Sequence, residues 1–277
     1  MSHDLPEDAR PDLLEEGDEV DASSAPLLDH LTELRRRLII SLVALFIAAI
    51  VCFAFATPIY NWLLTPYQNA VAARAEDTAF GLIYTAPLEI FFANLKIALF
   101  GGMFIAFPII AWQLYAFVAP GLYKNERGAF LPFLVAAPTL FTAGALFVLY
   151  LMFPLVMRFA LGFEQAGGDG QAQIDAQIRV AEYLSLIMAL MLAFGLSFQL
   201  PVILALLGKA GIIHADTLRT GRKYALVGIL TASAFLTPPD IISQIMLTVP
   251  VYGLYEISIW IVSVIEQKEE PSDAAKA

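Results

Sequence analysis

The chain has 277 residues, of which 59% are hydrophobic and 15% are charged, and its mean hydropathy is +0.71. Soluble globular domains are about half apolar and about a quarter charged, so this composition excludes an ordinary soluble domain. The net charge is −10, but the acidic excess is concentrated near the N-terminus and says little about the remaining chain.

Residues 1–29 are predicted to form a disordered, acidic cytoplasmic tail. The stretch from Asp4 to Asp29 has the sequence DLPEDARPDLLEEGDEVDASSAPLLD. A polar, acidic segment of this kind buries too little apolar surface to offset its ordering entropy. Residues 267–277 are similarly expected to form a short cytoplasmic C-terminal tail.

Between the tails, residues 30–266 contain six apolar runs. A helix that crosses the hydrocarbon layer needs about 20 apolar residues, and the runs comprise residues 38–56, 97–118, 130–152, 184–207, 225–236 and 241–265. The fifth run would extend only ~18 Å as a helix. The turn Thr237-Pro238-Pro239-Asp240 joins it to the sixth run in a tight hairpin. We therefore expect an all-α polytopic membrane domain with six transmembrane helices and short fifth and sixth spans.

Lysine and arginine set the expected orientation, because they are enriched in cytoplasmic loops. With six spans, four of the 16 basic residues fall on one side: Arg74, Lys96, Arg158 and Arg179. The other twelve fall on the side that holds both termini. The sequence thus predicts a cytoplasmic N-terminus and a cytoplasmic C-terminus.

Five prolines lie in or at the ends of these runs: Pro108, Pro138, Pro154, Pro201 and Pro250. Proline removes a helical hydrogen bond and bends the helix. Repeated bends favour a curved wall of helices over a straight bundle.

Catalytic and metal-binding patterns are absent from the sequence. The three histidines, His3, His30 and His214, lie outside the apolar runs, and the single cysteine, Cys52, has no partner for a disulfide. There is no HExxH motif and no phosphate-binding GxxxxGK[ST] motif. We expect no catalytic residues, no metal, no cofactor and no nucleic-acid partner, and a chain that holds, guides or conducts.

A few polar residues need an explanation in so apolar a chain. Glu33 and Glu126 each lie near the cytoplasmic start of a span, where an acid also complements the helix dipole. Gln199 lies within the fourth run, where an interhelical hydrogen bond is the simplest account. Asp240 either caps the sixth helix or has a role of its own, and Gln244 follows one turn later.

Four motifs, in order along the chain, resemble those of the TatC family. They are HLTELRRRL at residues 30–38, FVAPGLYKNER at 117–127, FGLSFQLP at 194–201 and LTPPDIISQ at 236–244. The resemblance extends from residue 30 to about residue 265.

The resemblance implies a receptor for twin-arginine signal peptides, with a concave, glove-like face, in the bacterial cytoplasmic (inner) membrane. TatC-like subunits work in a hetero-oligomer with single-span TatA and TatB partners and export folded proteins at the expense of the proton gradient. The implied signal-peptide site comprises Glu33, Arg35, Phe117, Pro120 and Glu126. The implied translocation or partner positions are Pro66, Gln199, Asp240 and Gln244. Many relatives carry glutamate at the position of Gln199, so a proton-binding role there is in doubt.

Physical chemistry supports part of this picture independently of the resemblance. Two guanidinium groups bind best to two fixed carboxylates, and Glu33 and Glu126 are predicted on the same cytoplasmic rim. Two other functions stay open. A small-solute transporter predicts charged residues meeting near the membrane midplane, and a scaffold predicts no preference for arginine pairs over lysine pairs.

Overall fold

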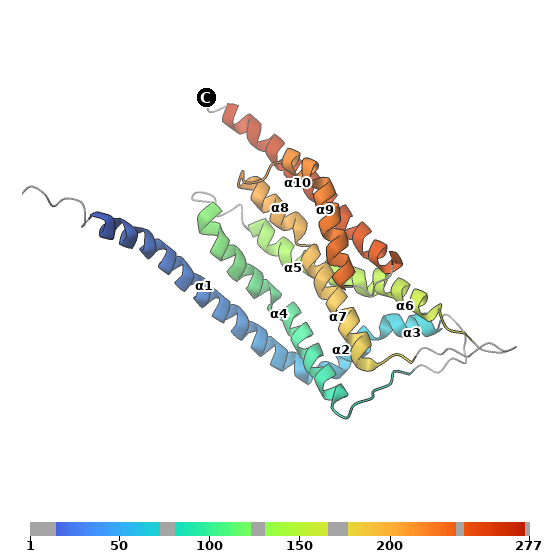
Figure 1. The fold of residues 1–277 in the computed structure, drawn as a ribbon. Coiled ribbons are helices and arrows are strands. Elements are labelled where there is room, and N and C mark those ends of the chain that lie inside the picture. The colour runs from blue at the N-terminus through green and yellow to red at the C-terminus, as the bar shows by residue number, and fades with distance from the viewer. Residues whose placement is uncertain (1–14, 73–80, 123–130, 166–176, 237–240, 275–277) are drawn as a thin grey trace, which may run out of the picture.

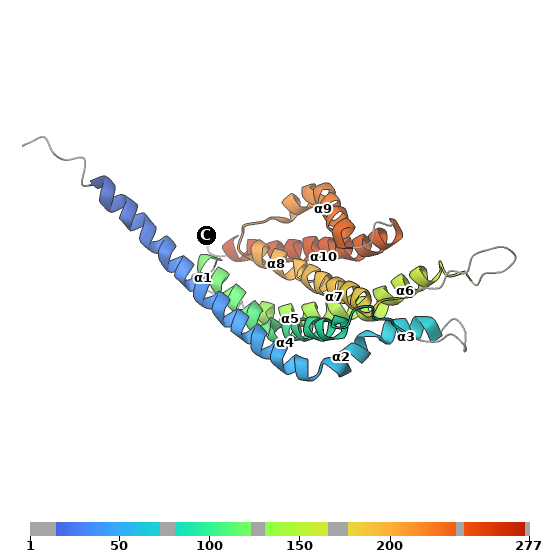
Figure 2. The ribbon, with the colours of Figure 1, turned by 60° about the horizontal axis from the view of Figure 1, so that its bottom comes forward.

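The computed structural model of the protein describes residues 15–72, 81–122, 131–165, 177–236 and 241–274. Within these ranges the chain is helical, apart from short connections and one isolated bridge between residues 83 and 179. The helices lie in a layer that curves from α1 at one edge to α9 and α10 at the other (Figures 1 and 2).

The first edge of the layer is formed by α1 (Glu15–Ala54) and α4 (Glu89–Leu122), which lie side by side (Figure 1). Two short helices, α2 (Ala56–Leu63) and α3 (Thr65–Ala72), connect them in sequence. Glycine permits the close contact of α1 with α4, because a Cβ on Gly102 would lie 2.7 Å from the backbone nitrogen of Ala49. The outer surface of α1 is apolar and exposed, as expected of a lipid-facing helix.

Prolines interrupt the helices in the centre of the layer. The third hydrophobic stretch consists of α5 (Leu131–Phe147), a π-helical turn (Val148–Met152) and α6 (Phe153–Leu161), with Pro154 following the π turn. The fourth consists of α7 (Val180–Ser197) and α8 (Leu200–Lys209), with Pro201 at the start of α8. Pro154 and Pro201 each lie in the first turn of the helix that follows the interruption, where the missing N–H of proline costs no helical hydrogen bond. Pro108 and Pro250 lie within the uninterrupted α4 and α10.

The other edge is a hairpin of α9 (Ala215–Leu236) and α10 (Ile241–Ala274). The two helices contact each other along the whole of α9. The backbone N–H of Ala215 donates to Glu266 Oε1 at 3.0 Å near one end, and Gln244 Nε2 donates to the carbonyl of Leu230 at 3.0 Å near the other. The two helices are therefore antiparallel and level with each other.

Five helical stretches within the described residues are long and apolar enough to cross a membrane. They are His30–Ala54, Glu89–Phe117, Pro132–Leu161, Val180–Lys209 and Gln244–Gln267. They correspond to the first four predicted spans and the sixth. The predicted fifth span, 225–236, is the second half of α9, which is not among the five.

Residues 15–29 belong to α1, within the stretch that the sequence predicted to be a disordered tail. Helix propensity does not explain this extension, because the stretch includes Gly17 and Pro26, which are unfavourable in a helix interior. Residues 1–14 lie outside the described residues. At the other end, α10 continues through the predicted C-terminal tail to Ala274.

Candidate functional site

One end of the α1–α4 pair gathers polar and aromatic side chains from both helices. The His30 ring of α1 stacks on the Phe117 ring of α4, with centroids 4.3 Å apart and planes 21° apart. One turn further along α1, Arg37 donates to Glu33 Oε1 through Nε at 3.0 Å and through Nη2. Arg37 Nη1 also donates to Gln113 Oε1 of α4 at 3.4 Å. We call these five residues the α1–α4 strip.

The strip brings together two residues of the predicted signal-peptide site, Glu33 and Phe117, and adds His30, Arg37 and Gln113. The Glu33 side chain is 38% exposed, so its carboxylate is accessible to a ligand. The two Arg37 donors meet the same oxygen of this carboxylate, Oε1. The other oxygen, Oε2, accepts no hydrogen bond from the described residues.

The other predicted members of this site are less completely described. Arg35 is exposed, two positions from Glu33 on a different side of α1. Pro120 belongs to the last turn of α4. Glu126 lies outside the described residues, so its expected proximity to Glu33 stays a prediction.

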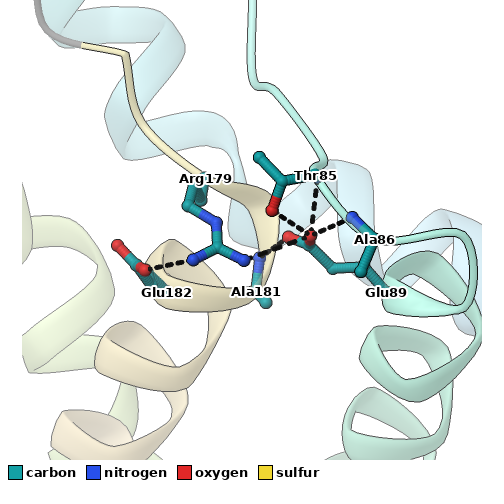
Figure 3. Close-up of polar contacts among 6 residues, drawn as sticks. All are labelled: Thr85, Ala86, Glu89, Arg179, Ala181 and Glu182. Carbon is teal, nitrogen blue, oxygen red and sulfur yellow. Dashed lines mark hydrogen bonds and ion pairs between the residues drawn. The ribbon is translucent and has the colours of Figure 1, made fainter.

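The opposite end of the molecule contains a polar cluster that the sequence did not reveal (Figure 3). The Glu89 carboxylate, at the start of α4, has a side chain only 5% exposed. Its Oε2 accepts the backbone N–H of Thr85 at 2.8 Å and that of Ala86 at 3.3 Å. Its Oε1 accepts the backbone N–H of Ala181 in α7 at 3.2 Å. Glu89 therefore binds backbone groups from the connection before α4 and from the first turn of α7, which are far apart in the sequence.

Arg179 closes this cluster, which we call the Glu89 latch. Its Nη2 lies 3.5 Å from Glu89 Oε2, and its Nη1 donates to Glu182 at 3.0 Å. Backbone hydrogen bonds from Ile83 N–H to the Ile178 carbonyl and from Val180 N–H to the Ile83 carbonyl join the same two segments. The latch thus fixes the segment before α4 against the start of α7.

The sequence carries a local signal for the start of α4. An acid in the first turn is typical of a helix start, and Glu89 follows Pro87, which lies just before the helix. The partner across the fold, Ala181, leaves no such signal, because a backbone N–H carries no sequence information.

Pro66 is buried in the first turn of α3, at the end that holds the Glu89 latch. Beside it, burial raises the pKa of the Tyr67 phenol, with the Glu164 carboxylate acting in the same direction. The phenol therefore stays a neutral donor, and it bonds to the Gly81 carbonyl at 3.4 Å. The nearby Tyr183 hydroxyl of α7 donates to the Leu63 carbonyl at 2.8 Å in a buried contact.

Gln244 and Gln199 both make interhelical hydrogen bonds. Gln244 joins α10 to α9 through the Leu230 carbonyl. Gln199 is 6% exposed, and its Nε2 donates to the Ala137 carbonyl of α5 at 2.9 Å. The hydrogen bond expected of Gln199 is confirmed, while roles of the two residues in translocation stay predictions. Asp240 lies outside the described residues.

The described part of the chain holds no group of three or more histidine, cysteine or acidic side chains arranged to bind a metal ion. A further charged pair joins the last two helices. In α9 and α10, Arg222 donates to both oxygens of Glu256 at 2.8 Å, and the Tyr252 hydroxyl donates to the same carboxylate at 3.0 Å.

Comparison with known proteins identifies the family. A family profile described as "Sec-independent protein translocase protein (TatC)" matches residues 29–250. A protein of that name from Magnetococcus marinus is 42% identical over 252 residues, which are 91% of this chain and 89% of the relative. The protein of that name from Escherichia coli K12 is 34% identical over 235 residues, 85% of this chain and 87% of the relative.

A solved structure is similar over nearly the same region. The crystal structure of a protein described as "Twin Arginine Translocase Receptor- TatC" superposes with a TM-score of 0.74 and 35% sequence identity. The match covers 86% of this chain and 99% of that one. Together with the apolar helices, these matches indicate a multi-pass membrane protein. The chain belongs to the TatC family of Sec-independent protein translocase proteins.

Proposed function

We propose that this chain is the signal-peptide receptor and core subunit of a twin-arginine translocase. In this role it recognises paired arginines on folded cargo through the Glu33 carboxylate of the α1–α4 strip. The observation that carries the proposal is an accessible carboxylate, placed beside an aromatic pair at one end of two lipid-facing helices. Charge-assisted hydrogen bonds of a guanidinium to such a group are worth about 1.5–3 kcal/mol each.

Arginine specificity follows from the geometry of the ligand. A guanidinium is planar and offers parallel N–H groups that match both oxygens of a carboxylate, whereas a lysine ammonium acts as a point charge. Glu126, only a few residues beyond the end of α4 at Leu122, is the expected acceptor for the second arginine. The rings of His30 and Phe117 offer an apolar surface for the residues that flank the arginines.

The proposed topology has six spans with both termini in the cytoplasm. The antiparallel register of α9 and α10 supports the fifth span. Because α9 lies level with α10, which is long and apolar enough to cross the membrane, α9 would cross the same thickness of the membrane. Arg222 and Glu256 are paired at that depth, which lowers the cost of charge in the membrane. The excess of lysine and arginine on the side of the termini supports the same orientation.

We further propose that the chain transports proteins without catalysing a reaction of its own. The proton gradient supplies the energy, and single-span TatA- and TatB-like subunits complete the complex in the bacterial inner membrane. Pro66, Gln199, Asp240 and Gln244 are the proposed positions for translocation and partner docking. The chain's membership of a translocase family supports these assignments.

Export of a twin-arginine reporter, in cells that lack their own TatC, tests the function. The wild-type chain should restore export, and Glu33→Gln should abolish most of it because an amide cannot pair bidentately with a guanidinium. Glu182→Gln is the matched control, since it removes the same charge from an exposed side chain at the opposite end. Equal export by the two variants, at equal membrane levels, would refute the proposed site.

A further inference from the structure

The Glu33 carboxylate already holds a guanidinium from its own chain. Arg37, one helical turn away, places both Nε and Nη2 against Oε1. Gln113 of α4 holds the remaining Nη1 through its side-chain oxygen at 3.4 Å. The Arg37 side chain is 22% exposed, so it lies in the strip and does not extend freely into solvent.

We propose that Arg37 is an internal competitor that occupies the receptor carboxylate and must be displaced when a signal-peptide arginine binds. This inference rests on the proposed function. An incoming guanidinium reaches its full bidentate geometry only if both Glu33 oxygens are available. Oε2 has no recorded partner within the described residues, so the ligand can bind there first and then take Oε1 from Arg37. Binding is then an exchange of one guanidinium for another.

The alternative is that Arg37 merely anchors α1 at the membrane surface. Arginines at the cytoplasmic ends of spans have this role in general. Arg36, adjacent and exposed, suits it. An anchor needs no contact with a second helix, whereas Arg37 bonds to both Glu33 of α1 and Gln113 of α4. The geometry therefore favours a specific role for Arg37 in controlling access to Glu33.

The need to displace Arg37 weakens the binding of every signal peptide without changing which peptide is preferred. Helix ion pairs four residues apart are weak when partly exposed, so removing the competitor should tighten peptide binding only about two- to fivefold. The same cost is subtracted from every cation that takes Oε1 from Arg37, whether it is a guanidinium or an ammonium. With both kinds of peptide displacing Arg37, the ratio of affinities for arginine and lysine pairs should stay constant. Peptides that bind weakly would fall below the range in which they are captured.

Fluorescence anisotropy on the purified full-length chain in detergent micelles tests the inference. The probes are two labelled peptides that carry Arg-Arg or Lys-Lys before the same apolar segment. Arg37→Gln should lower the Kd of both peptides about two- to fivefold relative to Arg36→Gln, which removes the same charge without breaking the pair. Arg37→Lys, which keeps the charge and the orientation of α1, should shift Kd less in the same direction. If Arg37→Gln fails to fold, the Kd of Arg37→Lys tests the inference in its place.

Two results would overturn the inference. If Arg37→Gln binds no more tightly than Arg36→Gln, Arg37 is not a competitor. If it alters the ratio of the two affinities, Arg37 contacts the peptide directly. Glu33→Gln separates these failures from a failure of the proposed function. If Glu33→Gln loses binding of the arginine peptide, the proposed receptor site is supported whatever the Arg37 variants show. If Glu33→Gln binds that peptide unchanged, both the receptor site and the role of Arg37 as a competitor are refuted.

Discussion

Replacing Gly102 by alanine should force α1 and α4 apart. A Cβ at this position would lie 2.7 Å from the backbone nitrogen of Ala49 and 2.8 Å from its Cα. Heavy atoms in normal contact are about 3.5–4.0 Å apart, so the helices must separate by ~0.8–1.3 Å. The atoms in the way belong to the backbone, so no side-chain rotation relieves the clash. Overpacking of this kind costs about 1–3 kcal/mol.

Alanine also favours the helix over glycine by about 1 kcal/mol, which offsets part of this cost. Gly253→Ala in α10 measures the helix propensity alone, because its added Cβ would meet no atom within 4 Å outside its own stretch of helix. Gly102→Ala should therefore be less stable than Gly253→Ala by about 1–3 kcal/mol. Thermal denaturation in detergent, followed by size-exclusion chromatography, measures the order of the two. Equal stability of the variants, or greater stability of Gly102→Ala, would refute the close packing of α1 on α4.

Two further predictions concern the opposite end of the molecule. Glu89→Gln places an amide against backbone N–H groups, so hydrogen exchange should accelerate in residues 82–86 and 178–183. Glu182→Gln, which removes only the exposed partner of Arg179 and no acceptor of a backbone N–H, should accelerate it less. Equal exchange in both variants would contradict the latch. Tyr183→Phe strips the buried Leu63 carbonyl of its donor and should lower stability by about 1–3 kcal/mol. Tyr224→Phe, at a side chain 72% exposed, should have no effect in the same denaturation assay. An equal loss of stability in Tyr224→Phe would show that the hydrogen bond of Tyr183 is not responsible.

The positions of the apolar helices were predictable from the sequence because burial in lipid requires long uninterrupted apolar runs. Their ends were not. The second span was predicted to begin near residue 97, yet α4 begins at Glu89, because residues 90–95 are largely apolar and Lys96 only interrupts the run.

The candidate site was predictable in part for a similar reason. Motifs within one segment, such as the one that contains Glu33, can be recognised from order and spacing alone. Contacts between residues of different segments cannot be recognised in this way, because the sequence does not state which helices are neighbours. The contact of Arg37 with Gln113 and that of Glu89 with the N–H of Ala181 both depend on the packed helices. Neither Arg37 nor Glu89 was therefore among the residues predicted to belong to a site.

Site-specific photocrosslinking in intact membranes tests the central claim most directly, namely that the Glu33 end of the α1–α4 strip captures paired arginines. A photoreactive side chain at Leu34, which is 42% exposed beside Glu33, should crosslink to a twin-arginine peptide and lose that crosslink when the pair is changed to lysines. The same side chain at Tyr84, 63% exposed near the Glu89 latch, should not crosslink. Crosslinking from residue 84 and none from residue 34, or crosslinking from residue 34 that is indifferent to the arginines, would contradict the account.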